Sequence, residues 1–133
     1  MLKRHPLRKL AAIYVGGVVG ALLRVGLSEA FPHAVDAWPW PTFAVNLVGA
    51  FLIGYFFTSF RDHGPHQLHH PFFATGICGT LTTFSTMQLE LFNMVDAGEF
   101  GLVISYLAAS LALGYVALRL GIATVESRLQ ART

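Results

Sequence analysis

Long uncharged stretches separated by short polar segments dominate the chain. They cover Leu10–Leu23, Ala37–Phe60, Pro71–Leu89 and Phe100–Leu118. A helix needs about 20 mostly apolar residues to cross a bilayer. Three stretches approach or exceed that length, and the first reaches it if Arg24 lies near its end and the helix extends to Phe31. The pattern predicts an all-α integral membrane protein, a single domain over residues 1–133 whose four transmembrane helices have approximate spans 7–31, 42–60, 71–95 and 100–118.

The third stretch has an unusual composition for a membrane span. Between Gly76 and Thr86 it holds two glycines and five hydroxyl residues, where an ordinary span would have leucine. Glycine and threonine both weaken an α-helix, and non-helical backbone survives in a membrane only when it is buried in protein or lines a polar cavity. We expect this helix to be broken near mid-membrane. The alternative is a continuous helix in which serine and threonine bond back to their own carbonyls.

Small and polar residues recur at helical spacing on the other spans. Gly16 and Gly20 have the GxxxG spacing that permits close approach of two helix backbones. On the fourth span Tyr106, Ser110 and Gly114 follow one another at i+4 and form one narrow face with two hydroxyls. Taken alone, that face is typical of ordinary packing through small residues, and a polar track is the alternative.

Composition and charge agree with a membrane protein. Hydrophobic residues make up 54% of the chain and charged residues 12%, with a mean hydropathy of +0.57, whereas about a quarter of an ordinary soluble domain is charged. With four spans, eight of the nine lysines and arginines lie on the side of the two termini, and the positive-inside rule places that side in the cytoplasm. This tally explains the pI of about 9.0, so nucleic acid is not an expected partner. The one cysteine, Cys78, excludes an internal disulfide.

The N-terminus also fits a secretory signal. Basic residues precede the first apolar run, and the small residues Ser28 and Ala30 follow it. The glycines at 16, 17 and 20 favour a retained, packed helix instead, and Arg24 interrupts the expected cleavage region.

Histidines gather in the loop between the second and third spans, at His63, His66, His69 and His70. Imidazole is the commonest metal ligand, so a metal site is conceivable. Because no cysteine or spaced carboxylate completes a recognisable ligand set, we favour a solvated loop.

Uncharged hydrogen-bond donors are more informative than acids or bases. The sequence has no HExxH, GxSxG or P-loop spacing, and Glu90 is the only acid embedded in a span, so we do not expect an enzyme. Hydroxyl and amide donors suit an anion, whose removal from water costs on the order of tens of kcal/mol unless replacement partners are close. Phe84 lies within the polar stretch and can present its electropositive edge. Freed carbonyls at a helix break could conversely hold a cation.

Four helices in so small a chain cannot easily surround an aqueous pathway, so transport implies an oligomer.

Three segments carry a resemblance to a known family. They read GGVVGALLR at 16–24, TFAVNLVGAFLIG at 42–54 and GICGTLTTFST at 76–86. The chain closely resembles the CrcB/Fluc fluoride channel family, whose GGxxGAxxR, TxxxNxxGxFxxG and GxxGxxTTFST patterns occur here in the same order. The four-span resemblance covers nearly the whole chain.

The resemblance implies a fluoride-selective passive channel, a multi-pass protein of the cell inner membrane that lets fluoride leave the cytoplasm. It implies an antiparallel, dual-topology homodimer in the lipid bilayer, with two pores along the subunit interface and a central structural sodium ion (Na+). Asn46 would be the pore amide and Phe84 a pore phenylalanine, and the main-chain carbonyls of Gly79 and Thr82 would bind the sodium. The remaining polar residues of the fluoride pathway would be Thr42, Ser85, Thr86, Tyr106 and Ser110. Arg24 and Glu90 would flank the pathway near its vestibules.

Three features depart from the family pattern. Met87 stands where the family has its second pore phenylalanine; its thioether fills space but lacks a ring edge. Gly114 stands where a serine often continues the polar face. The one-sided basic residues favour a single orientation, whereas a dual-topology protein should have nearly balanced charge.

Two other functions fit a small four-helix chain. A small multidrug resistance exporter, working by proton-coupled antiport, needs a carboxylate within its first helix, and Leu10–Ser28 contains none. A non-transporting assembly subunit would show small-residue faces without a continuous polar track.

Overall fold

Six helical elements make up the computed structural model, which describes residues 5–61 and 68–131. They are α1 (His5–Ala30), α2 (Trp40–Ser59), the π-helix η1 (His70–Cys78), α3 (Gly79–Leu81), α4 (Phe84–Asp96) and α5 (Phe100–Gln130). No strand occurs in the described residues. Three of the continuous helices, α1, α2 and α5, are long and apolar enough to cross a membrane. The predicted all-helical membrane fold is confirmed, and so is the break, because α3 ends at Leu81 and α4 begins at Phe84.

The last helix is longer than the hydropathy pattern predicts. We expected the fourth span to end at Leu118, where Arg119 interrupts the uncharged run, but α5 continues to Gln130. Its extension still has an inward face, since Gly121 and Val125 are buried. One charged residue on an exposed face does not end a helix whose other face remains packed.

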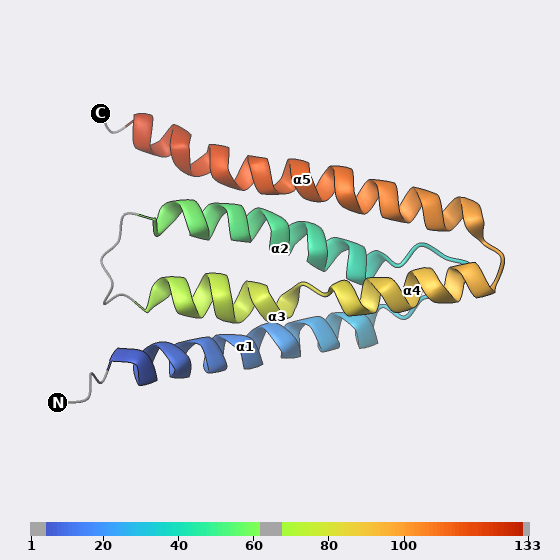
Figure 1. Cartoon of the computed structure of the whole chain (residues 1–133), viewed down its shortest axis with the longest axis horizontal. Helices are drawn as coiled ribbons and strands as arrows, with labels where there is room; N and C mark the ends of the chain where they lie inside the picture. Colours follow the sequence, from blue (N-terminus) through green and yellow to red (C-terminus); the bar gives the residue numbers. More distant parts are fainter. Residues whose placement is uncertain (1–4, 62–67, 132–133) are drawn as a thin grey trace.

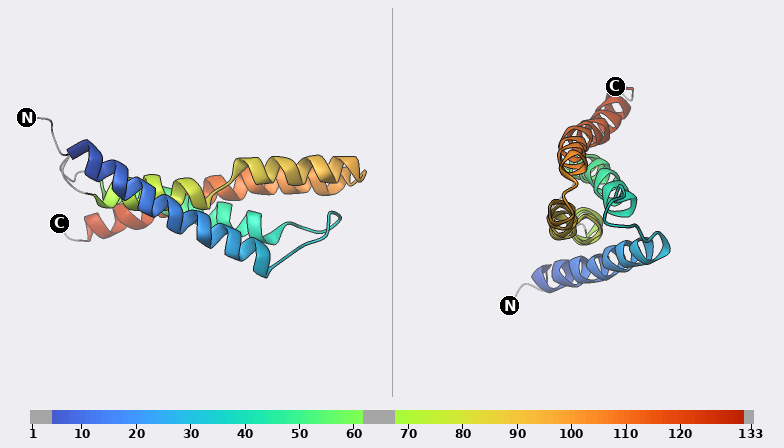
Figure 2. Two further views of the ribbon diagram at one scale, coloured as in Figure 1. Left: turned by 90° about the horizontal axis from the view of Figure 1, so that it is seen from below. Right: turned by 90° about the vertical axis from the view of Figure 1, so that its right-hand side faces the viewer.

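The helices form two closely packed pairs. In Figure 1, α2 lies between α5 and the η1–α3 segment, and α1 crosses below; α2 packs mainly on α5, and α1 mainly on η1. The other views show α1 inclined to the rest, so that α1 and α2 touch little (Figure 2). The start of α1 and the end of α5 lie at the same end of the molecule (Figure 1).

Glycines allow both pairs to approach at backbone distance. A Cβ added at Gly16 would overlap with the carbonyl oxygen of Phe72 in η1, and one at Gly121 would overlap with the carbonyl oxygen of Phe51 in α2. At Gly26, further along α1, the added Cβ would meet nothing within 4 Å. The predicted GxxxG contact is therefore used within the chain, between α1 and η1.

Five buried apolar side chains form a small cluster where the start of α2 meets α4 and α5. It contains Phe43, Met87, Leu91, Met94 and Tyr106. Elsewhere the helices expose many large apolar side chains. Such an apolar surface is compatible with contact to lipid tails. The cluster packs α2, α4 and α5 together at the level where the polar residues lie.

Candidate functional site

The break between α3 and α4 consists of two extended residues. Thr82 has φ −71° and ψ 147°, and Thr83 has φ −146° and ψ 112°. A helix that stops inside a membrane leaves carbonyl and N–H groups without their usual partners, and each must find another one. Side chains from α1 and α2 supply several of those partners.

Asn46 on α2 bonds to both sides of the Thr83 peptide unit. Its Oδ1 accepts from the Thr83 N–H at 2.8 Å, and its Nδ2 donates to the Thr83 carbonyl at 3.2 Å. In a continuous helix the Thr83 N–H would donate to the carbonyl of Gly79 four residues earlier. Here the Thr83 N–H donates to the side-chain amide of Asn46 instead. Asn46 therefore stabilises the break and releases the Gly79 carbonyl, which has lost this helical hydrogen bond.

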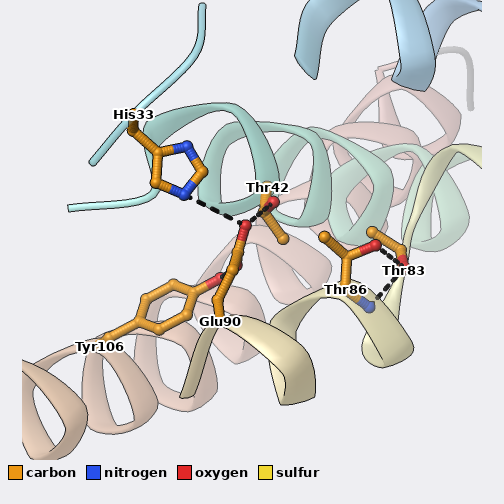
Figure 3. A network of polar contacts seen from close by, with 6 residues as sticks. All are labelled: His33, Thr42, Thr83, Thr86, Glu90 and Tyr106. Carbon is orange, nitrogen blue, oxygen red and sulfur yellow. Dashed lines mark hydrogen bonds and ion pairs between the residues drawn. The ribbon is translucent and has the colours of Figure 1, made fainter. Parts of the chain in front are cut away.

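Thr83 also begins the second half of the span. Its Oγ1 accepts from the Thr86 N–H at 3.1 Å, as an N-cap does (Figure 3), and it lies 2.9 Å from the Thr86 hydroxyl and 3.2 Å from that of Ser85. A continuous helix would direct the Thr86 N–H to the carbonyl of Thr82. The cap therefore releases a second carbonyl at the break.

Arg24 on α1 bonds to the end of the first half. Its Nε donates to the Thr80 carbonyl at 3.1 Å. The Thr80 hydroxyl donates in turn to the Gly17 carbonyl at 2.8 Å, which ties α3 to α1. A cation at the C-terminal end of a helix is stabilised by the helix dipole. Arg24 thus bonds to the backbone beside the break, and it does not pair with Glu90.

The carbonyls that this arrangement releases are the two for which a sodium role is implied, those of Gly79 and Thr82. Gly79 is exposed, and its surroundings leave open space where a Cβ would project. Neutral carbonyl oxygens near a helix break are suitable ligands for a hard monovalent cation. The two carbonyls are ligands of the type that such a cation takes, and they supply part of a coordination shell.

A groove lies beside the break, with a mostly apolar lining that includes four polar residues, Asn46, Thr82, Thr83 and Ser110. It has a volume of about 350 Å³ and is bounded by α2, α4 and α5. Its lining residues are Asn46, Ala50, Ile53, Thr82, Thr83, Phe84, Met87, Ser110, Leu111 and Gly114. The ring of Phe84 is 68% exposed, whereas Met87 is 7% exposed and belongs also to the apolar cluster. The groove brings together Asn46, Phe84, Met87 and Ser110, four of the residues expected along the pathway.

A second polar cluster surrounds Glu90 on α4. The hydroxyl of Thr42 donates to its Oε1, and the hydroxyl of Tyr106 donates to its Oε2 at 2.8 Å (Figure 3). Thr42 is 3% exposed and Tyr106 0%, and neither lines the groove. Hydrogen bonds from two donors offset part of the cost of burying a negative charge. Two expected pathway residues therefore bind the carboxylate instead of opening onto the groove.

The expected pathway residues thus fall into three places in the structure. Asn46, Phe84, Met87 and Ser110 line the groove, Thr42 and Tyr106 hold Glu90, and Ser85 and Thr86 contact the cap at Thr83. Of the histidine loop, His63 and His66 lie outside the described residues. Among the described residues, no group of three metal-ligating side chains is present.

Sequence reasoning gave too little weight to two side chains. Thr83 was one of several hydroxyl residues, yet it is the partner of Asn46 and the cap of α4. A threonine immediately before a helical segment is an N-cap signal, and this signal could have predicted that a helix begins at Phe84. His33 lies 3.6 Å from Glu90, and no sequence pattern marked it.

Comparisons with known proteins show which family the chain is similar to. A family model described as "CrcB-like protein, Camphor Resistance (CrcB)" matches residues 11–122. The chain is 45% identical over 126 residues to the "Fluoride-specific ion channel FluC 1" of Mycobacterium tuberculosis, covering 94% of this chain and 96% of that protein. It is 32% identical over 120 residues to the "Fluoride-specific ion channel FluC" of Bacteroides fragilis, covering 86% of this chain and 94% of that protein.

Proposed function

We propose that this chain, which belongs to the family of CrcB-like proteins, is a fluoride-specific ion channel of the cell membrane. The observation that carries the proposal is its 45% identity, over 94% of its length, to a protein named for that function. The groove supports it, because it presents amide and hydroxyl donors without a charged side chain. A passive pathway needs no catalytic group.

Fluoride passes along the groove between α2, α4 and α5. Asn46 retains one Nδ2 hydrogen beyond the one that it gives to the Thr83 carbonyl, and Ser110 adds a hydroxyl. Phe84 presents a ring whose edge carries positive charge density. Together these groups replace part of the water that a small anion loses.

A second copy of the chain closes the groove. In one copy the groove is open and Phe84 is mostly exposed, and polar groups left facing lipid would cost several kcal/mol each. An antiparallel homodimer gives two such grooves and so two pores along the subunit interface. The family resemblance implies dual topology, whereas the one-sided basic residues favour a single orientation.

A sodium ion at the break stabilises the assembly. The Gly79 and Thr82 carbonyls are released by Asn46 and by the cap at Thr83. A bound cation would satisfy them where water is scarce.

Fluoride efflux from vesicles tests the proposed function. We expect liposomes that contain the purified chain and are loaded with potassium fluoride to release fluoride down its gradient, measured with a fluoride electrode, when valinomycin balances the charge. Matched chloride-loaded vesicles should release little. An absolute requirement for a counter-gradient of protons would contradict a channel and favour the exporter, and the absence of ion flux would favour an assembly subunit.

A further inference from the structure

The loop between α1 and α2 brings a histidine to Glu90, outside the groove. Nε2 of His33 lies 3.6 Å from Oε1 of Glu90, and the side chains are 29% and 10% exposed (Figure 3). The two residues line a cavity of about 110 Å³ with Val35, Asn93 and Met94. A partly exposed titratable group therefore faces a largely buried carboxylate at the end of the helix bundle.

Glu90 is the one charged group among the described residues that line the cavities next to His33. The larger neighbouring cavity, of about 630 Å³, is lined from α1 and α2 by uncharged residues. From α4 the other polar neighbour is the neutral Asn93, and from α5 the hydroxyl of Tyr106 bonds to the far oxygen of Glu90. Asp36 lies exposed on the same loop. The electrostatic partner of His33 is thus Glu90.

Protonation of the imidazole changes what the carboxylate presents to an anion. Histidine is the side chain whose charge changes between about pH 5 and 8. When His33 is neutral, hydroxyl donors alone offset the charge of Glu90. When His33 is protonated, a full positive charge faces Oε1. Glu90 lies one helical turn along α4 from Met87 in the groove lining, so its net charge acts on an anion that enters there.

We propose that His33 is a positioning residue for fluoride conduction, whose protonation offsets Glu90 and thereby raises the fluoride current on acidification. The inference rests on the proposed channel function. A carboxylate one helical turn from the groove lining repels an anion in that low-dielectric path, and a cation beside the carboxylate restores the local anion concentration. The current rises on acidification because acid adds a positive charge beside Glu90, and it falls in base because that charge is removed.

Fluoride currents in planar bilayers at symmetric pH test the inference. Symmetric pH makes the result independent of orientation, and neutral HF carries no current. We expect the wild-type current to rise about threefold or more between pH 8 and pH 5.5. His33→Gln should remain near the wild-type pH 8 level throughout, and His33→Lys, with a permanent charge, should remain near the pH 5.5 level.

A distant histidine provides the control. His69 lies beside Phe60 and lines neither cavity, so His69→Gln should keep the wild-type pH profile. A wild-type profile in His33→Gln would overturn the role of His33 while leaving the channel function intact. If His33→Gln does not assemble, His33→Lys decides: a flat, high current supports the inference and a wild-type profile overturns it. No fluoride current from the wild type at any pH would instead contradict the proposed function.

Discussion

Fluoride flux through the Asn46→Asp protein is expected to fall at least about a hundredfold below wild type. Asn46 lines the groove and bonds to both sides of the Thr83 peptide unit. A carboxylate there places negative charge on an anion path. Two like charges about 4 Å apart repel by about 4 kcal/mol at an effective dielectric constant of about 20, and about 1.4 kcal/mol changes a rate tenfold.

The same substitution also disturbs the break. Asn46 Nδ2 donates to the Thr83 carbonyl, and an aspartate oxygen in that place would face the carbonyl oxygen without a hydrogen. Vesicle efflux measures the flux, and size-exclusion chromatography shows whether the protein stays assembled. Gln88→Glu is the matched control, because it makes the same chemical change at an exposed position of α4 outside the groove. Wild-type flux in an assembled Asn46→Asp protein would refute the pathway through the groove.

The Phe84→Ile protein is expected to assemble normally and to conduct roughly three- to tenfold less fluoride. Isoleucine keeps much of the apolar volume but has no electropositive ring edge. Phe84 is 68% exposed in the single copy, so its loss should leave the packing of the chain intact.

A second exposed phenylalanine on the same helix separates the loss of a ring from the groove from a general effect of losing an exposed ring. Phe92 is 66% exposed and does not line the groove. Phe92→Ile therefore removes a ring of similar exposure on α4, and its efflux rate should match the wild type. Equal reductions in the two variants would indicate a general effect on the protein in the membrane, and unchanged flux in Phe84→Ile would remove that ring from the pathway.

The spans and the break could be predicted from the sequence because the membrane constrains both. An uncharged run of about 20 residues has few alternatives to a helix in lipid. The glycines and hydroxyl residues of the third run conflict with that helix, and the conflict lies where α3 ends at Leu81. The end of α5 was placed too early, because Arg119 stops the apolar run but not the packing against α2.

The partners of the site residues could not be predicted in the same way. Asn46 and Thr83 are 37 residues apart, and their pairing depends on how α2 and the break align. Glu90 could equally have paired with Arg24, yet the structure gives each carboxylate oxygen a hydroxyl donor and directs Arg24 to the Thr80 carbonyl. Residue types fixed the chemistry available, and only the tertiary fold decided which groups meet.

An experimental structure of the purified protein in a lipid bilayer with fluoride present tests the central claim most directly. We expect two copies to meet with their grooves covered, an interrupted span at Thr82 and Thr83, and anion density beside Asn46 and the edge of Phe84. A continuous third span, or a groove whose Asn46 and Phe84 face lipid tails in the conducting protein, would contradict it.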